Sequence, residues 1–220
     1  MRFDLVYAMA AIPAIIIALA FHEYGHAAMA TKMGDPTPRL QGRLTLNPLA
    51  HLDPMGTVFI LITVLAGFGI GWGKPVITNP AYYKQYRLGR VLVSIAGPAM
   101  NLCLAMLAIG VGYLLYAANT PLGNFGHLFL WVFIVINIVL MIFNLIPIPP
   151  LDGGHVLEMM LPWQMQEQFR RMAGIGMLVI LALLFFTPFF GMLIGGFMRG
   201  LIFLLSLGFG DGFVSYLFLA

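Results

Sequence analysis

Long apolar stretches recur along the whole sequence, and they limit its fold more than any other feature. A helix needs roughly 20 consecutive apolar residues to cross the hydrocarbon core of a bilayer, and several segments of this chain reach or approach that length. Of the 220 residues, 61% are hydrophobic and only 9% are charged, which is far from the balance of a soluble domain. The sequence therefore predicts an all-α polytopic membrane protein and excludes a soluble hydrolase.

The chain is expected to form one integral-membrane domain over residues 1–220, with a core over about 5–160 and C-terminal helices over about 172–210. Its first apolar segment is longer than the hydrophobic region of a signal peptide, so we expect it to be retained as a helix. The net charge is only +3, and the basic residues lie in short loops rather than in a stripe. This pattern argues against nucleic acid as a partner and favours the lipid bilayer.

The order of apolar and polar segments predicts about five or six transmembrane helices. Spans are expected at 5–30, 91–117 and 127–146. The tail 172–207 is long enough for two more spans, broken near Thr187-Pro188, although Arg199 lies inside the second of them. Residues 163–171 are typical of an interfacial helix.

The segment 55–72 is apolar but short and rich in glycine. The loops on both sides of it are basic, so a full crossing would place one basic loop outside, against the positive-inside tendency. We therefore expect a re-entrant hairpin here. Short membrane-associated β-strands are expected at 39–46 and 74–78, where an extended substrate could pair with a strand edge.

The strongest chemical signal is the pentad His22-Glu23-Tyr24-Gly25-His26, near the end of the first span. Two histidines four positions apart lie on the same face of a helix and can reach one metal ion. Zinc with three protein ligands keeps a fourth position for water, and the adjacent carboxylate of Glu23 can take a proton from that water. The alternative is a pair of histidines satisfied by hydrogen bonds, but three ionisable groups in a spanning helix favour a functional reason.

A third ligand must come from another segment, and Asp152 is an isolated acid that follows a later span. Three prolines before it end the helix, and Gly153-Gly154 after it allow close backbone approach. A carboxylate at such a break could face the metal. The residues alone leave a second role equally open, because Asp152 could cap the short helix that begins near Gly154.

Together with a third motif, these segments resemble the site-2 protease (M50-type) family of intramembrane zinc metalloproteases. The pentad matches the HExGH motif of that family, residues 95–101 (IAGPAMN) resemble its AGPxxN element, and residues 144–154 (NLIPIPPLDGG) match its NxxPxPxLDGG motif. The three motifs occur in the order found in the family. The resemblance implies that one zinc ion per chain is held by His22, His26 and Asp152, that Glu23 is the catalytic acid/base, and that Asn144 contacts the substrate carbonyl or the oxyanion.

Other polar residues near the motifs have two readings each. Asn144 could donate to an oxyanion or form an interhelical hydrogen bond, and neither is favoured. Gly97 and Asn101 are expected to serve close helix packing and a polar contact. His155 could support the metal site but is more simply a solvated residue, and His51 could regulate access but is more simply a turn-stabilising residue.

We therefore expect a short-form zinc endopeptidase without a PDZ or CBS domain, acting in regulated intramembrane proteolysis. Its substrate would be a membrane-anchored regulatory protein, cut in or near its transmembrane segment. We expect it in the inner membrane of a prokaryotic cell, with the active site towards the cytoplasm, and a homo-oligomer stays open. The alternative is a membrane metal-binding or metal-transport protein with the same ligands, although transport would need ionisable groups spread through the membrane depth.

Overall fold

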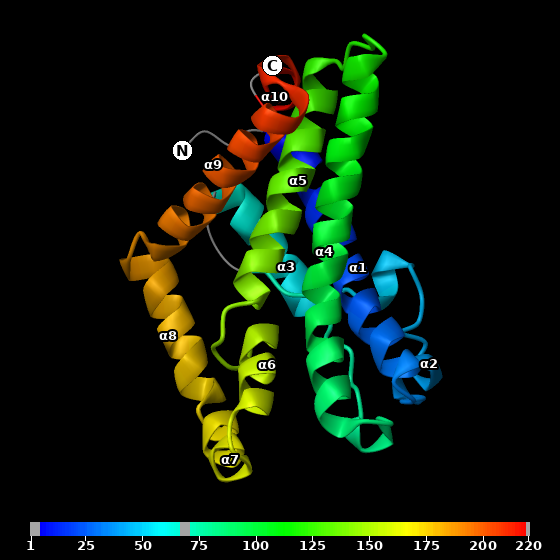
Figure 1. Cartoon of the computed structure of the whole chain (residues 1–220), viewed down its shortest axis with the longest axis vertical. Helices are drawn as coiled ribbons and strands as arrows, with labels where there is room; N and C mark the ends of the chain where they lie inside the picture. The colour runs from blue at the N-terminus through cyan, green and yellow to red at the C-terminus, as the bar shows by residue number, and fades with distance from the viewer. Residues whose placement is uncertain (1–4, 67–70, 219–220) are drawn as a thin grey trace.

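The structure, a computed structural model, describes residues 5–66 and 71–218. Within these residues the chain is built of helices (Figure 1). Four helices are long and apolar enough to cross a membrane: α1 (Leu5–Lys32), α4 (Tyr86–Ala117), α5 (Asn124–Asn144) and α9 (Phe189–Phe209). The predicted all-α membrane architecture is confirmed.

A fifth span is possible in the bent pair formed by α7 (Trp163–Arg171) and α8 (Ala173–Phe186), which meet at an angle of 58°. The described part of the chain thus holds four candidate spans, or five if the bent pair is one span, against the expected five or six. Helix α7 covers the residues expected to form an interfacial helix, and its Glu167 pairs with Arg170 at 2.8 Å and with Arg171 at 3.1 Å. Its polar character separates it from the apolar α8.

Helices α1, α4 and α5 form the bundle that positions the site, and they lie side by side in Figure 1. Helix α1 presents buried alanines to its neighbours, and Gly25 lets it approach α4 closely. A Cβ atom at Gly25 would lie 2.6 Å from the carbonyl oxygen of Ala96, closer than side chains allow. Small residues at such contacts are the usual basis of helix packing in membranes.

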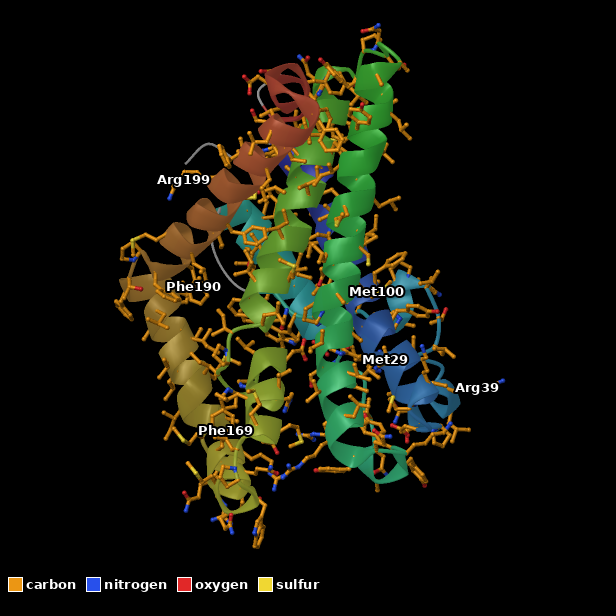
Figure 2. All side chains as sticks on the ribbon, in the orientation of Figure 1. Met29, Arg39, Met100, Phe169, Phe190 and Arg199 are labelled. Atoms are coloured by element: carbon orange, nitrogen blue, oxygen red, sulfur yellow. The ribbon has the colours of Figure 1, made fainter. Side chains whose placement is uncertain are left out.

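The end of this bundle that lies far from the pentad at residues 22–26 is covered by the last described helix. Helix α10 (Asp211–Phe218) packs on α4 and α5, with the side chain of Phe213 fully buried against Ile134 and Ile138. Helix α9 runs obliquely to α5 (Figure 1), and Arg199 points from it away from the bundle (Figure 2). The side chain of Arg199 is exposed, so its charge is not buried between helices.

The two ends of the segment 55–72 lie close together. Helix α3 (Pro54–Ala66) has 13 residues, which corresponds to about 20 Å and is too short for a full crossing. After it, the ring of Trp72 lies 5.0 Å from the ring of Phe59, and Gly73 forms an antiparallel bridge with Leu52. The described residues therefore agree with the expected re-entrant hairpin, and residues 67–70 of this segment lie outside them.

The two predicted β-strands were wrong. The stretch 39–46 begins inside the short helix α2 (Thr37–Leu40) and continues as turns, because the prolines around Thr37 favour a first helical turn. Residues 74–78 have neither helical nor ladder structure. Pro75 has no N–H to give to a ladder, and the N–H of Val76 is bonded to the Glu23 side chain. The isolated bridge beside them is the only strand-like pairing in the described ranges.

Phe213 and Phe203 offer a matched test of this packing, because the first is fully buried and the second is 62% exposed on α9. We expect Phe213→Ala to destabilise the fold by about 3 kcal/mol through the cavity it leaves. Phe203→Ala should change stability by less than about 0.5 kcal/mol. Thermal unfolding of the detergent-purified variants would measure both, and equal shifts would contradict the arrangement of α10.

Candidate metal centre

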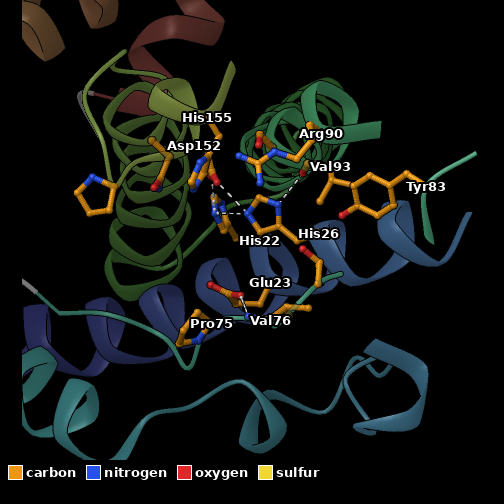
Figure 3. A pocket seen from close by; sticks show the side chains of 14 residues that line it. His22, Glu23, His26, Pro75, Val76, Tyr83, Arg90, Val93, Asp152 and His155 are labelled. Atoms are coloured by element: carbon orange, nitrogen blue, oxygen red, sulfur yellow. Dashed lines mark hydrogen bonds and ion pairs between the residues drawn. The ribbon is translucent and has the colours of Figure 1, made fainter. Parts of the chain in front are cut away.

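Two distant segments bring three candidate ligands together. His22 and His26 lie one turn apart on α1, and Asp152 is the first residue of α6 (Asp152–Met160). The Nε2 atoms of the two histidines are 3.0 Å apart. The Oδ2 atom of Asp152 lies 3.2 Å from Nε2 of His22 and 3.3 Å from Nε2 of His26. Figure 3 shows these three side chains pointing toward one another.

The outer nitrogens of both histidines have partners that fix their protons. Nδ1 of His22 lies 2.7 Å from Oδ1 of Asn101, and Nδ1 of His26 lies 2.7 Å from the carbonyl oxygen of Val93. Both oxygens can only accept, so each Nδ1 carries the hydrogen and donates it. Each neutral ring then turns the lone pair of Nε2 inward, as metal-binding histidines do.

The inward-facing atoms fit a cation. Oδ2 of Asp152 is buried and has no hydrogen-bond donor among the described residues, although it touches both rings. Two nitrogen lone pairs and a carboxylate oxygen this close repel one another unless a positive charge lies between them. Two imidazole nitrogens and one carboxylate oxygen are also a donor set that zinc accepts.

The break between α5 and α6 turns the Asp152 carboxylate toward α1. Leu151 occupies the N-cap position of α6, and Asp152 contacts the histidines. Its glycine neighbours make this turn possible, since a Cβ atom at Gly154 would lie 2.7 Å from the nitrogen of Pro149. The geometry thus differs from the N-cap alternative that the sequence left open.

The Asp152 carboxyl is ionised at neutral pH. Its burial alone would raise its pKa, but the contacts with His22 and His26 hold that pKa below the ordinary value. An ionised carboxylate is the form that binds a metal.

Glu23 lies beside this cluster without touching it. Its Oε2 atom accepts a hydrogen bond of 2.9 Å from the backbone N–H of Val76. Both residues line a cavity of about 270 Å³ that also contains the three candidate ligands (Figure 3). The cavity therefore holds a second carboxylate, that of Glu23, next to the candidate metal position.

The other predicted site residues have different surroundings. Asn144 lines the same cavity, and its Nδ2 donates to the carbonyl oxygen of Leu140 in its own helix at 3.0 Å, with no interhelical bond to another described residue. His155 also lines the cavity, and its side chain is 43% exposed. His51 is fully buried outside the cavity lining, and its Nε2 bonds the carbonyl oxygen of Thr45 at 2.8 Å, which is a turn contact.

Sequence reasoning missed an ion-pair cluster at the cavity wall. The carboxylate of Glu158, almost fully buried, lies 2.8 Å from Arg90 of α4 and 3.2 Å from Arg170 of α7. Glu158 belongs to α6, so these pairs tie the helix that carries Asp152 to both neighbours. The sequence offered only the charges as a signal, because the pairing depends on how the three helices lie.

Comparisons with known proteins identify the family of the chain. The chain belongs to Peptidase family M50, which matches residues 10–124 and 116–187. It is 41% identical over 178 residues to "Putative zinc metalloprotease YwhC" of Bacillus subtilis (strain 168), a match that covers 79% of this chain and 78% of that protein. The resemblance to site-2 proteases is confirmed.

Two further relatives carry the name "Putative zinc metalloprotease Rip2". The protein from Mycobacterium tuberculosis (strain H37Rv) is 34% identical over 180 residues, and that from Mycolicibacterium smegmatis is 32% identical over 173 residues. Each match covers 79% of this chain and 65% of the relative, so the chain spans slightly less than two thirds of the Rip2 proteins. No solved structure matches the chain significantly. With its apolar helices, the chain is an integral membrane peptidase.

Gly97 on α4 makes room for both histidine rings, which gives a sharp prediction. A Cβ atom there would lie 2.6 Å from Cε1 of His26 and 2.7 Å from Cε1 of His22. Gly97→Ala should therefore displace the rings and lower the affinity for zinc by at least about tenfold, as loss of ligand orientation does. The control is Gly110→Ala on the same helix, where a Cβ atom meets nothing within 4 Å. Equal zinc affinities of the two variants in a chelator competition would contradict the placement of the rings.

Proposed function

We propose that the protein is an intramembrane zinc endopeptidase in which His22, His26 and Asp152 hold one metal ion per chain. The observation that carries the proposal is the convergence of three acceptor atoms within 3.0–3.3 Å with no donor between them. The M50 family assignment and the relatives named as zinc metalloproteases support it. When bound, zinc would polarise the carbonyl of a peptide bond and acidify a water molecule.

Glu23 is the proposed general base. Its carboxylate lines the cavity beside the three ligands and is not one of them. It can take a proton from the attacking water and later give it to the leaving amine. The N–H of Val76 keeps the Glu23 carboxylate at the cavity wall, where it can serve this purpose.

Asn144 is the proposed donor to the oxyanion. Its side chain lines the cavity together with Asp152. The bond to Leu140 uses only one of the two hydrogens of the Asn144 amide. The second hydrogen is available for the oxygen on which charge develops during attack.

The proposed substrate is a membrane-anchored regulatory protein, cut in or near its transmembrane segment. Two of the candidate ligands, His22 and His26, lie on the membrane-spanning helix α1, so the bond to be cut must reach the depth of these residues in the membrane. The loops next to this end of α1 are basic, with Lys32, Arg39 and Arg43 after it, and by the positive-inside tendency we place the site towards the cytoplasm. We also propose that residues 1–220 act as one domain in a prokaryotic cell membrane.

Zinc content tests the proposal without knowledge of the natural substrate. We expect about one zinc per chain in the detergent-purified protein and a marked loss in Asp152→Ala, because the remaining two histidines hold a metal weakly. Glu23→Gln should keep the zinc and lose cleavage of a reconstituted transmembrane reporter peptide. Folded wild-type protein without any divalent metal would refute the metalloprotease proposal, and full zinc content in Asp152→Ala would remove Asp152 from the ligand set.

Asn144→Ala separates the oxyanion role from a purely structural one. We expect kcat for the reporter peptide to fall by about 10²–10³, as for other oxyanion donors, while zinc content stays that of the wild type. The matched control is Asn124→Ala, at the exposed opposite end of α5. An unchanged kcat in Asn144→Ala would exclude the oxyanion role, and the bond to Leu140 would then be the function of this side chain.

A further inference from the structure

Asn137 lies in the middle of α5 in a run of apolar residues, and its side chain is completely buried. A buried amide in apolar surroundings is unfavourable unless its donors and acceptor are bonded. Leucine or isoleucine would pack this position without that requirement. A polar side chain here therefore calls for a specific reason.

The amide of Asn137 has one fixed orientation. Its Nδ2 donates to the carbonyl oxygen of Phe133, one turn earlier in α5, at 2.8 Å. Its Oδ1 therefore faces α4, where it accepts a hydrogen bond of 3.0 Å from Nδ2 of Asn101. The backbone of α5 thus determines which atom is offered to Asn101.

Asn101 is also completely buried, and its amide is oriented from both sides. Its Nδ2 donates to Asn137 at 3.0 Å and to the carbonyl oxygen of Ala18 at 3.1 Å, which uses both hydrogens. Only Oδ1 is left for Nδ1 of His22, 2.7 Å away. A flipped Asn101 amide would point its oxygen at two acceptors and its hydrogens at the histidine.

We propose that Asn137 is a positioning residue for the metal centre, acting through Asn101 to keep the proton of His22 on Nδ1. The inference rests on the metal centre proposed above. The side chains of Asn137, Asn101 and His22 form one chain of hydrogen bonds that begins at the carbonyl oxygen of Phe133. In this arrangement the lone pair of Nε2 of His22 faces the metal position. His26 needs no such chain of hydrogen bonds, because its partner is the backbone carbonyl of Val93, which a helix already holds in place.

The competing role for Asn137 is an interhelical contact between α4 and α5 that only adds stability. The two roles predict different effects on zinc affinity. A stabilising contact changes the unfolding temperature alone, whereas a positioning residue also changes the affinity for zinc of the folded protein.

The variants Asn137→Val and Asn137→Thr separate these roles, because the two new side chains have nearly the same shape. A threonine hydroxyl can donate to the carbonyl one turn earlier, as Thr31 does to Ala27 at 2.8 Å in this chain, and still accept from Asn101. Valine can do neither. In a chelator competition on detergent-purified protein, we expect Asn137→Val to bind zinc about tenfold more weakly than the wild type and Asn137→Thr less than about threefold more weakly.

A double-mutant comparison tests whether the effect passes through Asn101. Asn101→Leu should weaken zinc binding at least as much as Asn137→Val, and adding Asn137→Val to it should have no further effect on zinc affinity. The packing control is Ile138→Ala, a buried neighbour on α5 that should lower the unfolding temperature and leave zinc affinity unchanged.

Wild-type affinity in Asn137→Val, equal losses in the valine and threonine variants, or additive losses in the double variant would each overturn the positioning role. These outcomes are distinct from failure of the metal centre itself, which would show as an absence of zinc binding in the wild type.

Discussion

The structure depends on the approach of one carboxylate to two histidine rings. Asp152 is held 3.2–3.3 Å from the inner nitrogens of His22 and His26, and nothing in the described residues offers a hydrogen between them. This arrangement is unfavourable without a cation, so the surrounding fold has to hold it in place. The bundle of α1, α4 and α5 and the proline-rich break before α6 supply that support.

Helix α4 supports the site through three residues spaced four positions apart. The carbonyl oxygen of Val93 accepts a hydrogen bond from His26, and the side-chain oxygen of Asn101 accepts one from His22. Gly97 leaves room for both rings. Residues at this spacing lie along one face of a helix, as His22 and His26 do on α1. One face of α4 therefore matches one face of α1, and both rings are oriented where the two helices meet.

The sequence predicted the parts of this site that depend on local pattern. The spans follow from apolar length, and the pairing of His22 with His26 follows from helical periodicity. The approach of Asp152 needed the family resemblance, because the residues alone fitted a helix cap equally well. The strands expected at 39–46 and 74–78 failed because prolines favour a helical turn at the first stretch and remove a ladder donor from the second.

Long-range partners could not be read from the sequence. Asn137 could have been noticed as an amide inside an apolar span, but its bond to Asn101 depends on how α4 and α5 are rotated against each other. Glu158 was visible only as a charge in a polar segment, and its pairs with Arg90 and Arg170 come from three different helices. Such contacts depend on tertiary packing, which cannot be predicted from local sequence propensities.

X-ray absorption at the zinc edge tests the central claim most directly, because it reports the atoms around the metal. A centre built from His22, His26 and Asp152 should show two imidazole nitrogens, with their outer-ring scattering, together with oxygen at roughly 2.0–2.2 Å. A zinc shell without imidazole scattering, or one with sulfur at roughly 2.3 Å, would contradict a centre built from His22, His26 and Asp152.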